Sequence, residues 1–314
     1  HAPETAEPAT PAGPVLAAGA PEGDTVIELN VTPDRGYCLS ARGLARELAC
    51  SFDLDFADPP TELSLPSRAE TWPLEVTEES GAQRFALRRV TGVDPGATTP
   101  WWMARRLLLS GVRPISPAVD VTNYVMLELG HPMHAFDAAT LAGGLTVRRA
   151  RAGETLTTLD DVERILDPED VVICDESGPI SLAGVMGGAR TEVSGSTTDV
   201  LLEAAVWDPL AVFRTIRRHK LPSEAGKRYE RGVDAAVSVA ALDRAATLLA
   251  EITGGTVEAS LTDVGSAPVV PTISFDPDRP SRVAGLEYPA GTTRHRLEQI
   301  GATVAGDDAV LLQV

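Results

Sequence analysis

Residues 200–207 read VLLEAAVW, an apolar run that carries one carboxylate, Glu203. Short apolar runs bounded by turn-forming residues are typical of buried strands. A charged side chain inside such a run is costly unless another group pairs with it. Glu203 is therefore either held by a structural partner or free to bind a ligand, and the sequence leaves both interpretations open.

Similar runs occur before residues 200–207. The strand candidates are 84–90 (RFALRRV), 118–130 (AVDVTNYVMLELG), 145–150 (LTVRRA), 170–175 (DVVICD) and 180–188 (ISLAGVMGG). Helices are expected over 100–111 (PWWMARRLLLSG) and 235–252, where Gly254 and Gly255 supply a C-terminal stop signal. Strands interspersed with helices predict an α+β fold.

The chain divides into four segments by composition. Residues 1–23 are rich in Ala, Pro and Gly and predict a disordered linker or tail. Residues 24–61 predict a strand (25–32), a turn and a helix that begins after Ser40. A Pro-rich break at 58–66 precedes a second unit, 65–266, and a third unit over 269–314 is expected to be the start of a truncated small domain.

The overall composition excludes several classes of protein. The 314 residues contain 43% hydrophobic and 23% charged residues, which excludes collagen, coiled coil and general disorder. Apolar runs are far shorter than the ~20 residues of a membrane span, and no secretory signal pattern opens the chain, so a cytoplasmic location is expected. Cys38, Cys50 and Cys174 form no CxxC pair and are expected to be reduced thiols.

The net charge of −18 disfavours general binding of polyanions, so any nucleic-acid contact must be local. Candidate contacts are residues 214–220 (RTIRRHK), Arg228 and Arg231. A solvated helix face is the favoured interpretation of such a charged run.

The densest set of polar side chains lies in residues 119–137, VDVTNYVMLELGHPMHAFD. It comprises Asp120, Thr122, Asn123, Glu128, His131, His134 and Asp137. This density suits the rim of a pocket, in catalysis or in recognition. A metal site on His131, His134 and Asp137 is an alternative, although Pro132 argues against the helix that it would need. A purely structural use of His134 stays open as well.

Two further motifs contain small residues. Residues 181–188 (SLAGVMGG) hold three glycines, which allow a ligand to approach the main chain, although the spacing is not that of a nucleotide phosphate loop. Residues 220–234 (KLPSEAGKRYERGVD) predict a helix that begins at Ser223, with Glu224 in its first turn.

Taken together and in this order, these stretches resemble the beta subunit of bacterial phenylalanyl-tRNA synthetase (phenylalanine--tRNA ligase). The resemblance rests on TPDRGYCLSARGLARELA, GVRPISPAVDVTNYVMLELGHPMHAFD, LAGVMGG, the LEAA strand and RYERGVD, from about residue 24 to the C-terminus. It implies that 65–266 form a mixed-sheet editing domain, which hydrolyses tyrosine wrongly attached to the phenylalanine tRNA.

The resemblance also implies a set of site residues. Catalytic residues would be Thr122, Asn123 and His134, and substrate-binding residues would be Pro132, Gly187, Gly188, Glu203, Ser223 and Ala225. Glu203 and a main-chain amide near Gly187 or Gly188 would read the phenol of tyrosine. His131 and Ser223 depart from the family, in which Gln and Thr are frequent at these positions. Neither a metal nor a covalent intermediate is expected.

The family works as an (αβ)₂ heterotetramer that charges tRNA-Phe in the cytoplasm, with the aminoacylation site on the alpha subunit. The expected partners are therefore the alpha subunit and tRNA-Phe, with no membrane. No cofactor is expected in this part, and ATP and magnesium serve the full assembly. The modules for anticodon binding, the oligonucleotide-binding insertion and the interface carboxylates are expected to be missing here. The alternative is a non-catalytic scaffold that binds tRNA or the alpha subunit.

Overall fold

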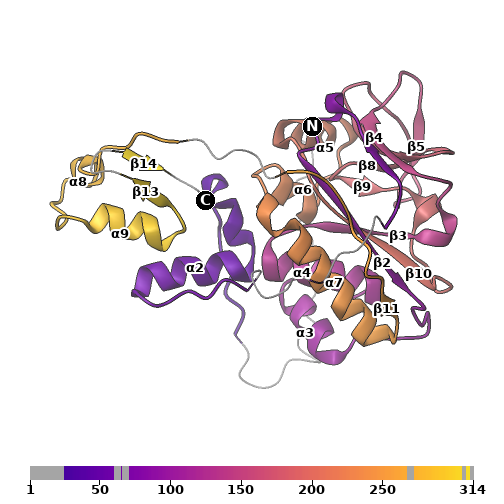
Figure 1. The fold of residues 1–314 in the computed structure, drawn as a ribbon, viewed down its shortest axis with the longest axis horizontal. Coiled ribbons are helices and arrows are strands. Elements are labelled where there is room, and N and C mark those ends of the chain that lie inside the picture. Colours follow the sequence, from indigo (N-terminus) through magenta and orange to yellow (C-terminus); the bar gives the residue numbers. More distant parts are fainter. Residues whose placement is uncertain (1–24, 60–64, 66–70, 267–271, 306–308, 312–314) are drawn as a thin grey trace, which may run out of the picture.

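The structure is a computed structural model that describes residues 25–59, 65, 71–266, 272–305 and 309–311 (Figure 1). The predicted tail over 1–23 lies outside the described residues, as do parts of the predicted boundaries at 61–65 and 266–269. Helices and strands alternate through the chain, and the sheets contain parallel and antiparallel pairs. The predicted α+β class is confirmed.

A central antiparallel sheet organises the main body. Its strands are β2 (Arg84–Thr91), β3 (Met133–Asp137), β10 (Asp199–Val206), β11 (Thr256–Val257) and β12 (Thr262–Gly265). Their order is β11-β2-β10-β3, with β12 also paired to β2. The strands predicted at 84–90 and 200–207 are thus neighbours, paired in register from Arg84 and Val206 to Thr91 and Asp199.

Three helices cover one face of this sheet (Figure 1). They are α3 (Trp101–Leu109), α4 (Pro117–Leu129) and α7 (Ser238–Thr253). Their apolar side chains join Ala86, Val90, Val200 and Leu202 of the sheet in one core. The predicted helix at 100–111 is confirmed, and the predicted helix at 235–252 is confirmed with Gly254 as its left-handed C-cap.

The strand expected at 118–130 is wrong, because this segment forms the helix α4. Pro117 occupies its first turn, and Gly130 ends it in the left-handed conformation. Val121, Val125 and Leu129 recur every four residues on its buried side. Packing on the sheet therefore outweighs the strand preference of the β-branched residues in this segment.

A second sheet packs against the opposite face. It contains β1 (Leu74–Val76), β4 (Leu145–Arg149), β7 (Val171–Asp175), β8 (Gly178–Leu182) and β9 (Met186–Gly187), in that order. Phe85, Phe136 and Leu201 of the central sheet meet Val147 and Ile180 of the second sheet in another core. This core is closed by α5 (Pro209–His219) and α6 (Glu224–Tyr229), and a hairpin of β5 (Thr155–Thr157) and β6 (Glu163–Ile165) flanks it.

A buried ion pair joins the central sheet to its helical cover. Arg88 of β2 and Asp243 of α7 have fully buried side chains, and the Arg88 Nη2 lies 2.5 Å from Asp243 Oδ1. Arg88 also donates to the carbonyl oxygens of Glu258 and Ser260, and Asp243 accepts from the Leu65 N–H at 2.7 Å. The hydrogen-bonding capacity of both groups is thus used, as a buried pair requires.

The N-terminal part contains a 3₁₀ helix, η1 (Pro33–Leu39), and α2 (Ala41–Phe52). Ser40 caps α2 as predicted, because its hydroxyl oxygen accepts from the Gly43 N–H at 3.0 Å. The strand predicted at 25–32 is wrong, since residues 25–32 pair with no described strand and the side chain of Ile27 is exposed. Short 3₁₀ helices also occur at η3 (Glu78–Ser80), η4 (Ala138–Thr140), η5 (Ala189–Thr191) and η6 (Ala235–Val237).

A small C-terminal unit contains α8 (Arg279–Ala284), α9 (Thr292–Gln299), β13 (Thr303–Ala305) and β14 (Ala309–Leu311). It lies beside α2, away from the two large sheets (Figure 1). The contact includes Asp53 at the end of α2, whose carboxylate receives a hydrogen bond from the Gln299 amide and lies 3.0 Å from the His295 ring.

Candidate functional site

Glu203 and His134 face each other across two neighbouring strands. They are direct partners in the antiparallel register of β10 and β3, so their side chains leave the sheet on the same face. That face is the one covered by the second sheet. Both side chains reach a small cavity of about 80 Å³ between the layers. The cavity is lined by Pro132, Met133, His134, Ser181, Leu182, Gly184, Val185, Met186, Gly187, Glu203, Trp207, Ala225 and Tyr229.

Glu203 is a buried acid without a counterion. Burial raises the pKa of its carboxyl from 4.5 to about 8. Burial is the only cause of this shift, since no hydrogen bond or charge from another residue in the described part of the chain contributes to it. A protein core seldom keeps a carboxyl group unmatched, and perturbed acids of this kind cluster at functional sites. The geometry therefore favours a ligand acceptor over a structural ion pair.

His134 is held as a neutral ring. Burial lowers its pKa from 6.5 to about 4, so the imidazole is uncharged at neutral pH. Its ring meets Phe136 edge to face, with 4.5 Å between centroids. The Nε2 atom is buried and has no hydrogen-bond partner among the described residues. A neutral nitrogen in this position can orient a water molecule or an ester by a hydrogen bond, while it is a weak base for full proton transfer.

The glycine motif forms the hairpin between β8 and β9 and the floor of the cavity. A Cβ atom at Gly187 would lie 2.4 Å from Cε1 and 2.7 Å from Nε2 of His134. Gly184 has φ +68°, and an added Cβ would lie 2.6 Å from Cδ1 of Trp207. Gly188 does not line the cavity. Its N–H donates to the Ile180 carbonyl oxygen at 2.7 Å. These contacts explain the need for glycine in this motif.

The predicted helix after Ser223 forms the remaining wall. Ser223 is the N-cap of α6, and its hydroxyl oxygen accepts from the Gly226 N–H at 3.0 Å. Ala225 lines the cavity, and so does Tyr229, whose hydroxyl donates to the Pro132 carbonyl oxygen at 2.9 Å. The hydroxyl of Ser223 therefore has a structural partner, whereas the small side chain of Ala225 leaves space for a ligand.

Thr122 and Asn123 lie on α4, and neither is among the residues that line the cavity. The apolar side of α4 packs on the opposite face of the central sheet. The Thr122 hydroxyl donates to the Val119 carbonyl oxygen at 2.8 Å. The structure thus brings together Pro132, His134, Gly187, Glu203 and Ala225, while the roles of Thr122 and Asn123 stay predictions.

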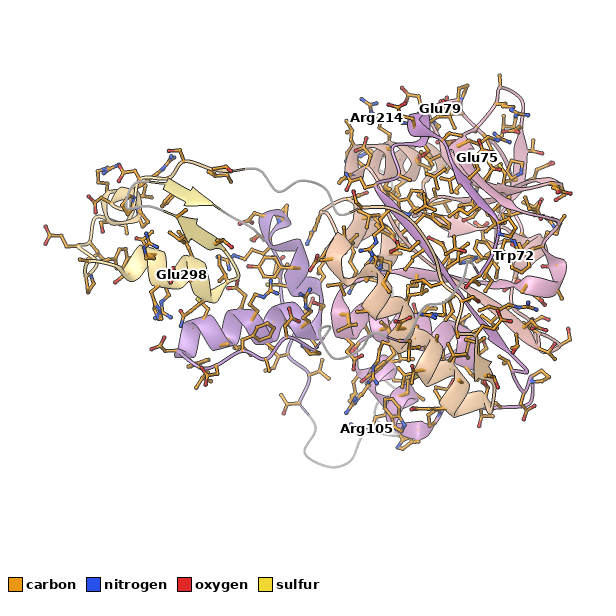
Figure 2. The ribbon with its side chains drawn as sticks, in the orientation of Figure 1. Trp72, Glu75, Glu79, Arg105, Arg214 and Glu298 are labelled. Carbon is orange, nitrogen blue, oxygen red and sulfur yellow. The ribbon has the colours of Figure 1, made fainter. Side chains whose placement is uncertain are left out.

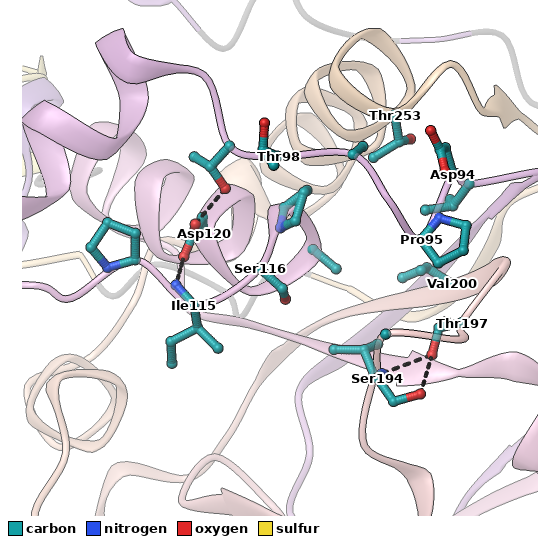
Figure 3. Close-up of a pocket in the computed structure, with 18 of the residues that line it drawn as sticks. Asp94, Pro95, Thr98, Ile115, Ser116, Asp120, Ser194, Thr197, Val200 and Thr253 are labelled. Atoms are coloured by element: carbon teal, nitrogen blue, oxygen red, sulfur yellow. Dashed lines mark hydrogen bonds between the residues drawn. The ribbon is translucent and has the colours of Figure 1, made fainter.

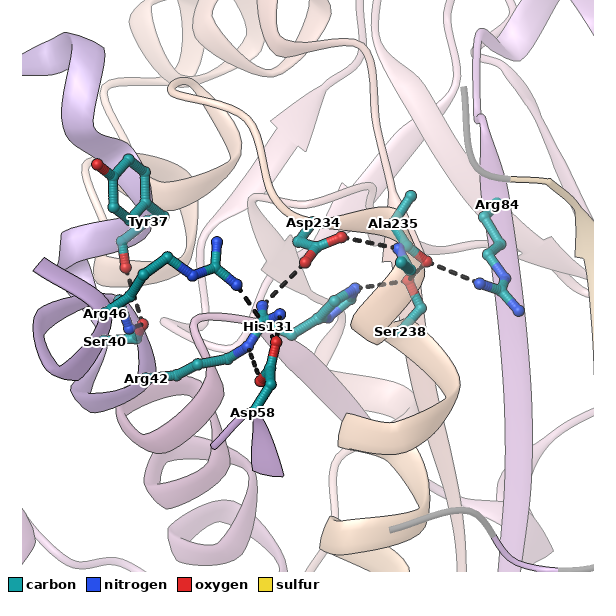
Figure 4. Close-up of polar contacts among 12 residues, drawn as sticks. Tyr37, Ser40, Arg42, Arg46, Asp58, Arg84, His131, Asp234, Ala235 and Ser238 are labelled. Carbon is teal, nitrogen blue, oxygen red and sulfur yellow. Dashed lines mark hydrogen bonds and ion pairs between the residues drawn. The ribbon is translucent and has the colours of Figure 1, made fainter. Parts of the chain in front are cut away.

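The metal alternative is not supported by the geometry. Within the residues that the structure describes, no group of three His, Cys, Asp or Glu side chains could hold an ion. His131 uses both ring nitrogens, because Nδ1 lies 3.0 Å from the Pro132 carbonyl oxygen. Its Nε2 lies 2.9 Å from the Ser238 hydroxyl (Figure 4). Asp137 leaves β3 on the other face from His134 and accepts from the Thr197 hydroxyl at 2.7 Å.

A larger cavity of about 540 Å³ lies beside the N-terminal end of α4 (Figure 3). Asp120 lies at its wall, and its carboxylate accepts hydrogen bonds from the Ile115 N–H and the Thr99 hydroxyl. On the opposite wall, Ser194 and Thr197 form hydrogen bonds with each other (Figure 3). The polar atoms of Asp120 are thus used within the protein, in contrast to those of Glu203 and His134.

The basic stretch at 214–220 is largely neutralised by neighbouring acids. Arg218 of α5 pairs with Asp170 and Glu169, and Arg214 lies at the surface, 3.9 Å from Glu169 (Figure 2). Arg228 is buried and pairs with Glu224. Arg231 donates to the Val31 carbonyl oxygen. The structure therefore agrees with the interpretation of these charges as helix-face and packing interactions.

The cavity residues that are missing from the set predicted from the sequence include two large aromatic side chains, Trp207 and Tyr229. Residues 203, 205 and 207 share one side of an extended strand, so alternation from Glu203 points to Trp207. No comparable signal identifies Tyr229, because its place in the cavity depends on how α6 packs.

Residues 81–254 match the B3/4 domain family, and the chain belongs to that family. It is 65% identical over 303 residues to the phenylalanine--tRNA ligase beta subunit of Nocardia farcinica, a match that covers 96% of this chain and 36% of that protein. The beta subunit of Mycolicibacterium paratuberculosis is 57% identical over 317 residues, covering 99% of this chain and 38% of that protein. The resemblance stated from the motifs is confirmed, and the chain spans little more than a third of these relatives.

Among solved structures, an N-terminal fragment of the phenylalanyl-tRNA synthetase beta subunit from Pyrococcus horikoshii is similar at 15% identity and a TM-score of 0.37. The match covers 88% of this chain and 77% of that one. No helix in the described ranges is long and apolar enough to cross a membrane. Cys38, Cys50 and Cys174 are all free thiols, as predicted.

Proposed function

We propose that this chain is the editing part of a phenylalanine--tRNA ligase beta subunit and hydrolyses tyrosyl-tRNA-Phe. The observation that carries the proposal is the pairing of Glu203 and His134 in one small cavity, where His134 Nε2 is buried without a partner and the Glu203 carboxyl makes no hydrogen bond to a described residue. Tyrosine exceeds phenylalanine by one hydroxyl, and an apolar synthetic pocket rejects an added hydroxyl poorly. A second site that binds the hydroxyl supplies the missing discrimination.

Each residue has a role that follows from its surroundings. The Glu203 carboxyl accepts a hydrogen bond from the phenol of the tyrosyl group. His134 Nε2 orients the ester or the attacking water, and Gly187 keeps the space beside the ring open. For Asn123 and Thr122, which lie on α4 and do not line the cavity, a role at the ester is implied by the resemblance alone. A phenylalanyl group would leave Glu203 unmatched, at a cost of about 1–3 kcal/mol.

The remaining properties of the family are part of the same proposal. The chain would act within an (αβ)₂ assembly in the cytoplasm, bound to tRNA-Phe and to an alpha subunit that charges the tRNA with ATP and magnesium.

A scaffold function without turnover is the second candidate. It is favoured by α3, which exposes Trp101 and Trp102 beside Arg106 at the surface. Exposed aromatic and arginine side chains of this kind are frequent in binding interfaces.

The test is the deacylation of tyrosyl-tRNA-Phe by the full chain, with phenylalanyl-tRNA-Phe as the control substrate. The Glu203→Ala variant should lose preference between the two substrates, and His134→Ala should lose rate on tyrosyl-tRNA-Phe. An exposed acid supplies the matched control, Glu79→Gln, which should behave as the unmodified chain. Binding of tRNA-Phe without hydrolysis by the unmodified chain would refute the editing proposal and favour the scaffold.

A further inference from the structure

Trp207 closes the cavity on the side next to Glu203. Its side chain is 3% exposed, and its ring meets Phe85 edge to face, with 5.8 Å between centroids. On the other side lies Gly184, where an added Cβ would be 2.6 Å from Cδ1 and 3.1 Å from Nε1 of the indole. The ring is therefore fixed by close packing, and its nitrogen side is the one that faces the glycine hairpin of the cavity.

The indole nitrogen has no acceptor. Trp207 Nε1 is buried and makes no hydrogen bond of normal geometry to a described residue, and the nearby Tyr229 hydroxyl donates to the Pro132 carbonyl oxygen. An indole N–H can only donate, and a buried donor without an acceptor is unfavourable. Such groups are uncommon in native proteins, and they need an explanation such as a ligand. The same cavity contains His134 Nε2, which is also buried without a partner, and the Glu203 carboxyl, which makes no hydrogen bond to a described residue.

A hydroxyl group complements this set of atoms. It donates one hydrogen and accepts through its oxygen lone pairs, so it needs an acceptor and a donor together. A carboxyl group supplies the acceptor in either protonation state, because the neutral acid keeps its carbonyl oxygen. Trp207 supplies the donor. The cavity of about 80 Å³ is only a few ångströms across, so one bound group can contact both walls.

We propose that Trp207 is a specificity-determining residue of this site: its Nε1–H donates to the hydroxyl oxygen of the bound aminoacyl side chain, while the Glu203 carboxyl accepts the hydroxyl hydrogen. This inference rests on the proposed editing function and adds a side-chain donor to the main-chain amide near Gly187 or Gly188 that the resemblance implies. A side chain without a hydroxyl leaves both the donor and the acceptor unmatched. Discrimination against phenylalanine therefore comes from two polar groups.

The first test replaces Trp207 with phenylalanine, which keeps an aromatic ring and removes the N–H. Loss of one neutral hydrogen bond should lower kcat/KM for tyrosyl-tRNA-Phe about three- to tenfold and leave that for phenylalanyl-tRNA-Phe unchanged. The matched control is Tyr288→Phe in the C-terminal unit, which removes one exposed donor (Tyr288 is 44% exposed) and should change neither rate. An equal fall on both substrates, or no change, would overturn the inference.

The second test is independent of turnover and of the folding of the variant. The unmodified chain is labelled with ¹⁵N, and the indole N–H signal of Trp207 is followed on addition of amide-linked tyrosyl-adenosine or phenylalanyl-adenosine. We expect the tyrosyl compound to shift this signal and the phenylalanyl compound to leave it in place. A shift in a chain that hydrolyses nothing would refute the editing proposal while the recognition role of Trp207 stands. No shift with the tyrosyl compound would overturn that role, whatever the hydrolytic activity.

Discussion

Replacement of Glu203 by glutamine should change how the stability of the chain depends on pH. The buried carboxyl has a pKa of about 8 in the folded chain, against 4.5 when it is free. The folded chain thus holds a proton that the unfolded chain releases between these values. Stability from this group is fully present below pH 4.5 and is lost as the pH rises through 8. Glutamine has a similar shape and does not ionise.

The magnitude follows from the shift. Each pKa unit corresponds to about 1.4 kcal/mol, so the whole shift amounts to about 5 kcal/mol, of which about 2 kcal/mol is lost between pH 6.5 and 9. The other titratable groups around the cavity act outside this window. The pKa of His134 is lowered to about 4 by burial, and its contribution is lost only as the pH falls below 6.5. Burial raises the pKa of Tyr229 above 10.

The assay is urea unfolding of the unmodified chain and of Glu203→Gln at pH 6.5, 7, 8 and 9. The free energy of unfolding of Glu203→Gln should gain about 2 kcal/mol relative to the unmodified chain across this range. The exposed Glu79→Gln variant should follow the unmodified chain. Parallel profiles for Glu203→Gln and the unmodified chain would refute the conclusion that Glu203 is buried without a partner.

Three further substitutions test the surroundings of the site. Gly187→Ala places a methyl group against the His134 ring, so it should destabilise the chain by about 1–3 kcal/mol and abolish hydrolysis. A variant that is active and fully stable would contradict the close contact between the Gly187 main chain and the His134 ring. Asp243→Ala leaves the buried Arg88 unpaired and should cost about 3–5 kcal/mol in urea unfolding, and a cost below 1 kcal/mol would show that the pair is not buried. Ser223→Ala should lower the free energy of unfolding by about 1 kcal/mol, because Ser223 caps α6. Ser223→Asp should keep the stability of the unmodified chain, since aspartate also caps helices. A loss of stability in Ser223→Asp as well would contradict the capping role and indicate a role at the ligand.

The sequence predicts the long elements of the fold well, because their patterns are local. The strands at 84–90 and 200–207 and the helices at 100–111 and 235–252 all form. The segment at 118–130 is misassigned, since its valines and its tyrosine favour strands while its tertiary contacts favour a helix. Residues 25–32 have the composition of a strand but no described partner strand, and composition alone cannot supply one.

The site is only partly predictable from the residues themselves. Glu203 is conspicuous within its strand, and His134 within its polar cluster, but nothing local indicates that they face each other. Their contact depends on the register of β3 against β10, which joins segments far apart in the sequence. The resemblance supplied this pairing, whereas the orphaned nitrogen of Trp207 became visible only from the packing around it.

The pleat of β10 directs alternate side chains to a closed apolar core on one side and to the layer that contains the cavity on the other. Leu202 and Ala204 point to the side of α3, α4 and α7, where they join a closed apolar core. Glu203 and Trp207 point to the other side, where the cavity leaves polar atoms unmatched. Unmatched polar atoms cost stability, and a densely packed core on the opposite face of the same strand offsets that cost. Leu201 and Ala205 on the cavity face also pack into a core with the second sheet, so the unmatched polar atoms interrupt that packing only where the cavity lies.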